Sequence, residues 1–198
     1  MGMRSGGVAV AVVLVACGPK QEEKVDPGAL RWEIVNGDAA PDTITPGPHE
    51  DSFADGTGSK PLTMDSYSSC SGGVLGIGDK CKTTYPTITG KVDGTGATLE
   101  IVFSGALVKG SNTLDADSFY RDPKTPDAGL SFKLTNASVE LLELAPSSAK
   151  ISGATLVGYL CGRGKADLTL GSNVVGSVTF KIKLVSPYAE TAMPACDP

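Results

Sequence analysis

An alternation of apolar and polar residues along the second half of the chain most constrains the fold. In the last segment of this pattern, one side carries Val174, Val178, Phe180, Ile182 and Leu184. The other side carries Ser177, Thr179, Lys181 and Lys183. Successive side chains of a β-strand point to opposite faces, so a period of two predicts a strand with one buried and one solvent-facing side.

The same period of two recurs in segments that turn residues separate. The predicted strands cover residues 31–34, 87–92, 97–104, 130–135, 154–160 and 165–170. Residues 137–144 fit either a strand or a short helix. Asp93-Gly94 predicts a tight turn, and Gly171-Ser172-Asn173 predicts a hairpin between the last two strands. Two-faced strands at hairpin spacing indicate an all-β fold, an antiparallel β-sandwich with a closed β-barrel as the alternative.

Residues 36–84 break the alternation. This segment is dense in Pro, Gly, Asp and Thr, within a chain that has 25 Gly and 13 Pro. Such a composition favours turns and loops over regular structure. We therefore expect a long irregular N-terminal region, ordered or partly disordered, in which short strands could form near residues 71–77.

The N-terminus carries an export signal. Arg4 precedes an apolar run from Gly6 to Ala16, and Cys17 follows it. This run is too short to cross a bilayer as a helix, which needs about 20 residues. Ending in Leu14-Val15-Ala16-Cys17, the segment resembles a bacterial lipoprotein signal peptide with its lipobox. The resemblance implies cleavage before Cys17, diacylglycerol on its sulfur, and an acyl chain such as palmitate on the new amine.

This resemblance sets the expected location and domain organisation. Residues 1–16 would be the signal peptide, residues 17–30 a flexible tether, and residues 31–198 a single β domain. Two or more acyl chains hold a protein stably at a membrane. Because Gly18 rather than Asp follows the cysteine, the resemblance favours the outer membrane of the cell envelope. An ordinary secretory signal and a transmembrane anchor are the alternatives.

The cysteine count agrees with an exported chain. Of five cysteines, four remain once Cys17 carries lipid. An even number in an exported protein predicts two disulfides, and four cysteines allow three pairings. The local pairing joins Cys70 to Cys81 and Cys161 to Cys196. The sequence leaves the other two pairings open.

Composition and motifs argue against several functions. The single His excludes metal sites that need two or three imidazoles. A net charge of -5 and the lack of a Lys/Arg cluster argue against nucleic acid as a partner. The sequence contains no nucleophile elbow, no phosphate-binding glycine loop and no CxxC motif. We therefore assign no catalytic, cofactor-binding or metal-ligating residue, and we expect no cofactor.

Some weaker signals remain. Four loop carboxylates lie close together in the sequence, where a solvated turn is favoured over a calcium site: Asp115, Asp117, Asp122 and Asp127. Asp51 and Asp55 have the same interpretation. His49 could act as a general base, but its Pro/Gly surroundings are typical of surface loops. The aromatic residues that could stack on sugars are Trp32, Tyr67, Phe119, Tyr120 and Tyr188.

Together these observations favour a lipid-anchored cell-envelope protein that is a non-catalytic binding or structural module. Its partners would be the membrane, through Cys17, and a protein or glycan that the sequence does not identify. An envelope hydrolase is one alternative, indicated if the loop carboxylates gather with His49 in a concave site. A small-molecule carrier is another, indicated if the apolar strand faces enclose a cavity.

Overall fold

The described part of the chain has an all-β fold, as predicted. The computed structural model describes residues 26–41, 44–53, 61–71, 80–92, 96–122 and 131–198, and within these ranges it contains no α-helix. The strands are β1 (Gly28–Asn36), β2 (Gly47–Ser52), β3 (Tyr67–Ser71), β4 (Lys80–Thr84), β5 (Thr87–Lys91), β6 (Thr98–Val102), β7 (Gly110–Asn112), β8 (Phe119–Arg121), β9 (Ser131–Ile151), β10 (Ala154–Leu170) and β11 (Asn173–Val185). The first of them, β1, begins inside the segment predicted as the tether.

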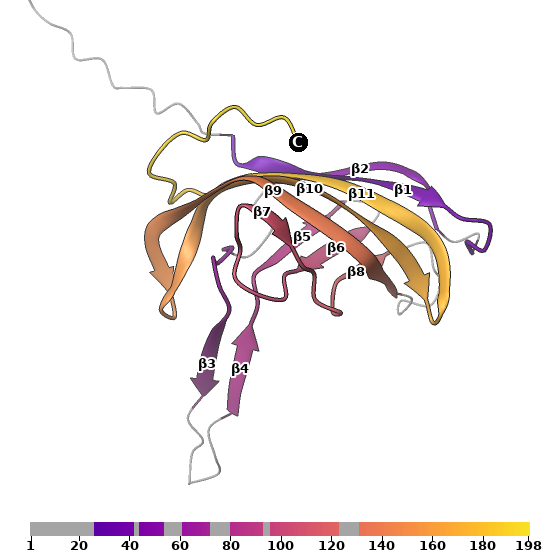
Figure 1. The fold of residues 1–198 in the computed structure, drawn as a ribbon, viewed down its shortest axis with the longest axis horizontal. Helices are drawn as coiled ribbons and strands as arrows, with labels where there is room; N and C mark the ends of the chain where they lie inside the picture. Colours follow the sequence, from indigo (N-terminus) through magenta and orange to yellow (C-terminus); the bar gives the residue numbers. More distant parts are fainter. Residues whose placement is uncertain (1–25, 42–43, 54–60, 72–79, 93–95, 123–130) are drawn as a thin grey trace, which may run out of the picture.

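Most of these strands belong to one antiparallel sheet that curls into a half-barrel (Figure 1). The order is β2-β1-β11-β10-β9-β8-β6-β5, and β7 also pairs with β9. In Figure 1 the arch of β1, β9, β10 and β11 covers β5, β6 and β8, so the sheet folds back over one core as the two layers of a sandwich do. At the ends of the sheet, the Lys91 amide of β5 donates a hydrogen bond to Oδ2 of the buried Asp51 of β2 (2.7 Å).

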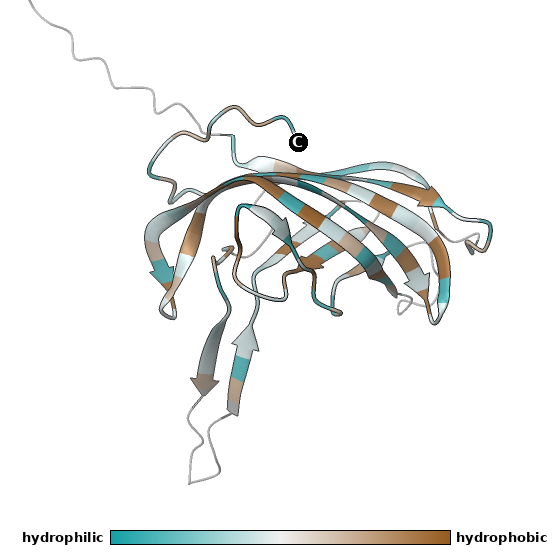
Figure 2. Cartoon of the chain, in the orientation of Figure 1, coloured by the Kyte–Doolittle hydropathy of each residue, from teal (hydrophilic) through white to brown (hydrophobic). Residues whose placement is uncertain are grey.

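The hydrophobic core lies between these two layers. On β1, Leu30, Trp32 and Ile34 are buried while Arg31 is exposed, as the alternation predicts. Figure 2 shows the same alternation as hydrophobic and hydrophilic bands along the strands. A Cβ atom on Gly90 of β5 would lie 2.6 Å from Cδ2 of Leu30 and 2.9 Å from Cζ3 of Trp32. The apolar faces of the two layers are therefore in direct contact.

The longest strands, β9, β10 and β11, form two successive hairpins. The predicted turn at Gly171-Ser172-Asn173 is confirmed, with Leu170 paired to Asn173. Register shifts in both ladders mark β-bulges, which bend strands without ending them. Residues 137–144 are accordingly part of the continuous strand β9 rather than a helix. The shift between Leu168 and Thr169 also turns Val174 outward, so Val174 is 51% exposed and does not belong to the buried face predicted for it.

The described part of residues 36–84, a segment expected to be irregular, contains three short strands. β2 has no apolar face of its own, but it pairs with β1, whose edge offers free backbone hydrogen-bonding groups. β3 and β4 form a separate two-stranded arm that projects from the body in Figure 1. Several predicted features lie outside the described residues: the signal peptide, Cys17, Asp55, the part of the 71–77 strand beyond Ser71, the Asp93-Gly94 turn and Asp127.

Both disulfides form in the local pairing. Cys70 of β3 is bonded to Cys81, the residue directly opposite on β4. Cys161 of β10 is bonded to Cys196 in the C-terminal tail that follows β11. The Ser147 hydroxyl of β9 donates a further hydrogen bond to the Tyr188 carbonyl of this tail (2.7 Å). The tail is therefore tied to the outer side of the sheet, where Figure 1 shows it above the arch.

Candidate functional site

The described loop carboxylates do not gather into one site. Asp115 and Asp117 share a turn, in which the Asp117 amide donates a hydrogen bond to Oδ1 of Asp115 (3.0 Å). Asp122 is buried, and its Oδ2 accepts hydrogen bonds from the Thr45 amide (2.7 Å) and the Tyr120 hydroxyl (3.2 Å). Asp122 therefore ties the end of β8 to the segment before β2. Asp51 and Asp122 are both buried, so neither lies in the solvated turn predicted for it.

His49 does not lie in the surface loop that its Pro/Gly surroundings predicted: it is part of β2 and belongs to an aromatic cluster rather than to an acid–base pair. Its ring stacks on Trp32, with centroids 5.5 Å apart, and lies 6.3 Å from the ring of Tyr120. Nε2 of His49 and Nε1 of Trp32 are buried and have no hydrogen-bond partner among the described residues. In the part of the chain that the structure describes, no group of three or more His, Cys, Asp or Glu side chains could hold a metal ion. His49 and the described loop carboxylates therefore do not form the concave site that the hydrolase alternative requires.

The aromatic residues considered for sugar stacking are dispersed over different elements. Trp32 and Tyr120 are 2% and 0% exposed, so both are core residues. Tyr67 lies on the arm, Phe119 on β8 and Tyr188 on the C-terminal tail. They therefore provide no common face on which a sugar could stack.

We expect Tyr120 to make the protein less stable at alkaline pH. Burial is the main reason why the pKa of its hydroxyl lies well above the usual value, and the charge of Asp122 and the hydrogen bond to it add to the shift. Because the folded state holds this proton more tightly, its stabilising contribution is full below about pH 10 and is lost as the pH rises further. We expect the melting temperature to fall above about pH 10, and to fall less steeply in Tyr120→Phe, when followed by circular dichroism. Parallel curves for the two proteins would contradict this assignment.

A groove of about 920 Å³ crosses the outer face of the sheet. Its lining comes from six neighbouring strands, β2, β1, β11, β10, β9 and β7. Exposed residues that face one another across these strands form two rows along it. The first row consists of Glu50, Arg31, Lys181, Arg163, Glu140 and Ser111. The second row consists of Pro48, Glu33, Thr179, Lys165 and Ser138.

The floor of the groove is the backbone between these two rows. The intervening residues are His49, Trp32, Phe180, Gly164 and Val139. Because neighbouring residues point to opposite faces of a strand, the side chains of this row face the core and leave only backbone toward the groove. No residue of the opposite layer, β5, β6 or β8, contributes to the lining. The groove therefore lies outside the sheet and is not the apolar cavity that a carrier would need.

Charge is unevenly distributed along the first row. Toward its ends, Arg31 forms an ion pair with Glu50 and Arg163 one with Glu140, each at 3.0 Å. The hydrogen bond to Glu50 also raises the pKa of Arg31. Lys181 stands in register between Arg31 and Arg163 and forms no ion pair with any described residue. Like charges opposite one another in a sheet are destabilising, so this row of three cations is not explained by stability.

The second row contains one cation, Lys165, and one anion, Glu33. Lys165 lies two residues beyond Arg163 on β10, on the same face. Thr179 stands between Lys165 and Glu33 in register, and neither charged residue forms an ion pair within the described ranges. Arg163, Lys165 and Lys181, which we call the central cations, therefore occupy the middle of the groove.

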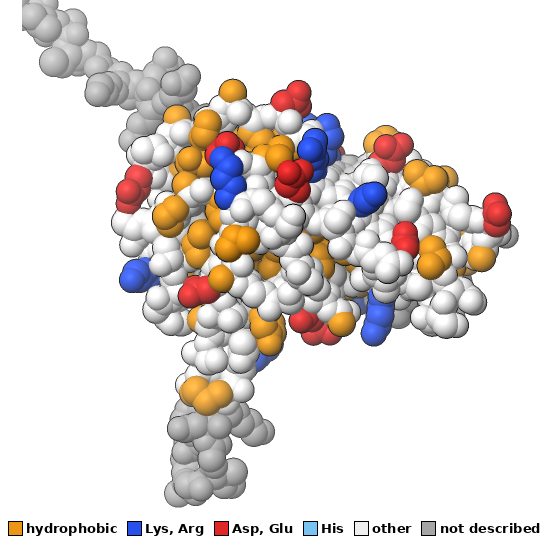
Figure 3. All heavy atoms as spheres, viewed as in Figure 1, with side chains coloured by type: hydrophobic (Ala, Val, Ile, Leu, Met, Phe, Trp, Pro, Cys, Tyr) orange, Lys and Arg blue, Asp and Glu red, His pale blue; other side chains and the backbone are white. Residues whose placement is uncertain are grey.

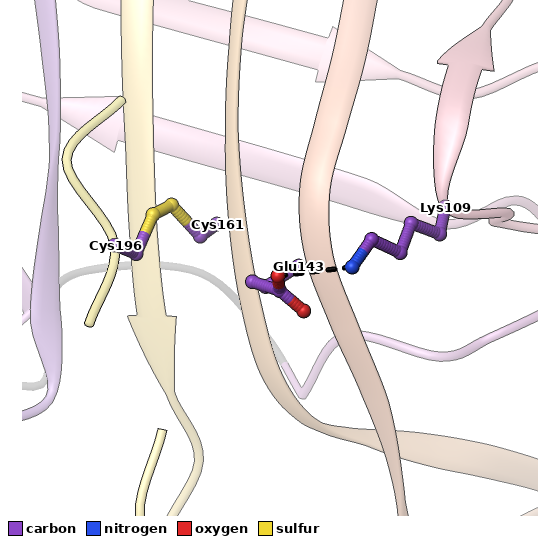
Figure 4. A network of polar contacts seen from close by, with 4 residues as sticks. All are labelled: Lys109, Glu143, Cys161 and Cys196. Carbon is purple, nitrogen blue, oxygen red and sulfur yellow. Dashed lines mark hydrogen bonds and ion pairs between the residues drawn. A yellow bond between two sulfur atoms is a disulfide. The ribbon is translucent and has the colours of Figure 1, made fainter. Parts of the chain in front are cut away.

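The C-terminal tail borders the groove on one side. Figure 4 shows the disulfide between Cys161 and Cys196 beside the ion pair of Lys109 and Glu143 (2.9 Å). A smaller hollow of about 230 Å³ adjoins the groove here, with Asp197 of the tail and Lys183 of β11 in its lining. Figure 3 shows basic and acidic side chains next to one another along the top of the body, where this outer face is seen from the side.

The groove was not predicted from the sequence, although part of the signal was present. Alternation places Arg31, Lys165 and Lys181 on the polar side of their strands. The alternation does not predict the order of the strands in the sheet, in which β1 pairs with β11, the last described strand. Only this long-range pairing brings Arg31 next to Lys181.

Comparison with known proteins adds no relative from which a function could be transferred. No family model matches the chain, and neither a curated protein nor a solved structure does. Over the residues that the structure describes, we find no helix with the length and hydropathy needed to cross a membrane. The function is therefore inferred from the residues of this chain alone.

Proposed function

We propose that the protein is a lipid-anchored binding module of the bacterial cell envelope, without catalytic activity, and that the outer-face groove is its binding surface. The observation that carries this proposal is a hollow of about 920 Å³ whose walls hold Lys165, Lys181 and Glu33, three charged side chains that form no ion pair with any described residue. Exposed charges in a concave site are available to a ligand at little cost, because no internal partner must be given up. The positions of Asp122 and His49 support binding rather than hydrolysis.

The cysteine pattern supports the anchor. The two disulfides use Cys70, Cys81, Cys161 and Cys196, so Cys17 is the cysteine left over. An odd cysteine in an exported chain calls for another use, and a lipid thioether is the one that the lipobox resemblance implies.

The position of the anchor would keep the groove near the membrane. Asp26, at which the described part of the chain begins, lines the smaller hollow beside the groove. It follows Cys17 by nine positions. A fully extended tether of that length reaches about 30 Å. By the resemblance of Gly18 to outer-membrane sorting signals, we propose the outer membrane as the location.

Replacement of Cys17 by alanine tests the anchor. We expect the wild-type protein, expressed in a bacterium, to incorporate labelled palmitate and to have an intact mass that begins at Cys17 with acyl additions. Cys17→Ala should incorporate no label and keep its leader, because the acyl acceptor is gone. Cys70→Ala is the matched control and should be labelled like the wild type. Label that persists in Cys17→Ala, or a wild-type protein with a free Cys17 thiol, would contradict the proposal.

A further inference from the structure

We propose that the groove binds an extended anionic glycan, and that the central cations hold a carboxylate or phosphate group of that glycan. This inference rests on the proposed binding function and names the class of ligand.

The three central cations lie next to one another on two paired strands, β10 and β11. Arg163 of β10 and Lys181 of β11 are directly opposite each other, which places their Cβ atoms about 5 Å apart. Lys165, two residues along on the same face of β10, is a diagonal neighbour of Lys181, at about 7 Å. Long side chains at these spacings reach a common point. An anionic group at that point would be surrounded by positive charge from both walls of the groove.

These cations have donors to spare. Arg163 donates from Nε (3.2 Å) and Nη2 (3.0 Å) to a single oxygen, Oε2 of Glu140. A guanidinium carries five N–H groups, so donors remain on Arg163. The ammonium groups of Lys165 and Lys181 form no ion pair with the described residues. Charge-assisted hydrogen bonds from such groups to carboxylate or phosphate oxygens are among the stronger polar contacts in proteins.

The remainder of the lining fits a sugar chain. The hydroxyl groups of Thr179 and Ser138 stand beside the cations in the second row. Glu33 and Glu50 lie toward one end and Glu140 toward the other. The carboxylates of these glutamates can accept hydrogen bonds from sugar hydroxyls. A chain of acidic amino acids offers no such hydroxyl groups. The lining therefore suits a ligand with a central negative charge and hydroxyl groups on either side.

The shape of the groove favours a chain over a flat membrane. It crosses six strands, and strands lie about 4.8 Å apart, so it is about 24 Å long. An anionic bilayer placed over this face would meet the three glutamates as well as the cations, and their charges would repel it. A narrow ligand can instead place its anion among the central cations and keep it away from Glu33, Glu50 and Glu140.

Binding measurements on the purified full-length protein test the inference. The probes are polygalacturonate, which carries carboxylates, and a phosphomannan, which carries phosphates, with dextran as the neutral glycan. Lys165→Gln combined with Lys181→Gln removes two central cations. Lys133→Gln combined with Lys150→Gln removes two exposed lysines of β9 outside the groove and is the matched control. Calorimetry gives each affinity, and circular dichroism checks that both variants are folded.

We expect at least one charged glycan to bind more tightly than dextran, and the groove variant to lose about tenfold or more in affinity while the control keeps it. The inference is overturned if neither charged glycan binds, or if both variants lose affinity equally. Equal affinity for poly-glutamate would show that charge alone is recognised, and binding to phosphatidylglycerol vesicles in place of glycans would make this face a membrane contact; each result also overturns it. None of these results bears on palmitate labelling at Cys17, so failure of the ligand class and failure of the anchor are distinguishable.

Discussion

Removal of the Cys161–Cys196 disulfide, by Cys161→Ala together with Cys196→Ala, will lower the free energy of unfolding by about 4 kcal/mol. The bond closes a loop over a sequence separation of 35 residues, so its loss gives the unfolded chain much more freedom. It also releases the tail from the sheet, where Cys161 is 0% exposed. Urea denaturation followed by circular dichroism measures the change.

The second disulfide provides the contrast. Cys70→Ala with Cys81→Ala opens a loop with a sequence separation of only 11, in an arm that pairs with no strand of the main sheet. An isolated two-stranded hairpin is marginally stable in water, so the arm itself should lose its structure. We expect rapid proteolysis within the arm but an unchanged urea midpoint for the body. A larger effect on the body from this pair than from Cys161 and Cys196 would contradict the proposed architecture.

Gly164→Ala will destabilise the protein by about 3 kcal/mol, the upper part of the range for an overpacked core. Gly164 lies in the floor row of the groove and is paired with Phe180 across the β10–β11 ladder. A Cβ atom there would overlap Cζ of the Phe180 ring and would lie 2.8 Å from the Ser138 carbonyl oxygen of β9. The ring could move, but the carbonyl belongs to a paired strand, so both neighbours must shift to admit the methyl group.

Gly105→Ala is the matched control for this substitution. A Cβ atom on Gly105 would meet no atom within 4 Å, and its backbone does not have the positive φ that favours glycine. We expect its melting temperature to equal that of the wild type to within a few degrees. If scanning calorimetry gave Gly105→Ala and Gly164→Ala the same melting temperature, the close packing of Phe180 over Gly164 would be wrong.

The fold class could be predicted because alternation is a local property of the sequence. The faces of β1, β6 and β11 follow directly from residues such as Leu30, Leu99 and Phe180, all of which are buried. The β-bulges could not be predicted from the alternation, because they depend on how two strands pair with each other. The orientation of Val174 shows the limit: one register shift moved it from the predicted buried face to the surface.

The short strands and the groove depend on long-range pairing. β2 forms on the edge of β1 although the segment Gly47–Ser52 has little apolar content, so its own composition does not predict a strand. The groove requires β1, β10 and β11 to lie side by side. Since β1 is the first and β11 the last of the described strands, this arrangement depends on pairing between distant parts of the sequence. No local pattern around Arg31 or Lys181 indicates that the two face each other.

The three cations of the first row also affect the stability of the free protein. Arg31, Lys181 and Arg163 are held next to one another by backbone pairing, and their repulsion is only partly offset by Glu50 and Glu140. Exposed ion pairs of this kind contribute about 0.2–1 kcal/mol each. A bound anion would relieve the repulsion, so the same residues that weaken the free sheet would strengthen the complex.

Lysine footprinting tests the central claim, that the groove is the binding surface, most directly. The full-length protein is treated with an amine-acetylating reagent with and without polygalacturonate or the phosphomannan, and modified lysines are identified by mass spectrometry. We expect the glycan to protect Lys165 and Lys181 and to leave Lys133 and Lys150 as reactive as before, because only the first two line the groove. Protection of Lys133 and Lys150 with Lys165 and Lys181 unchanged, or no protection at all, would contradict the account.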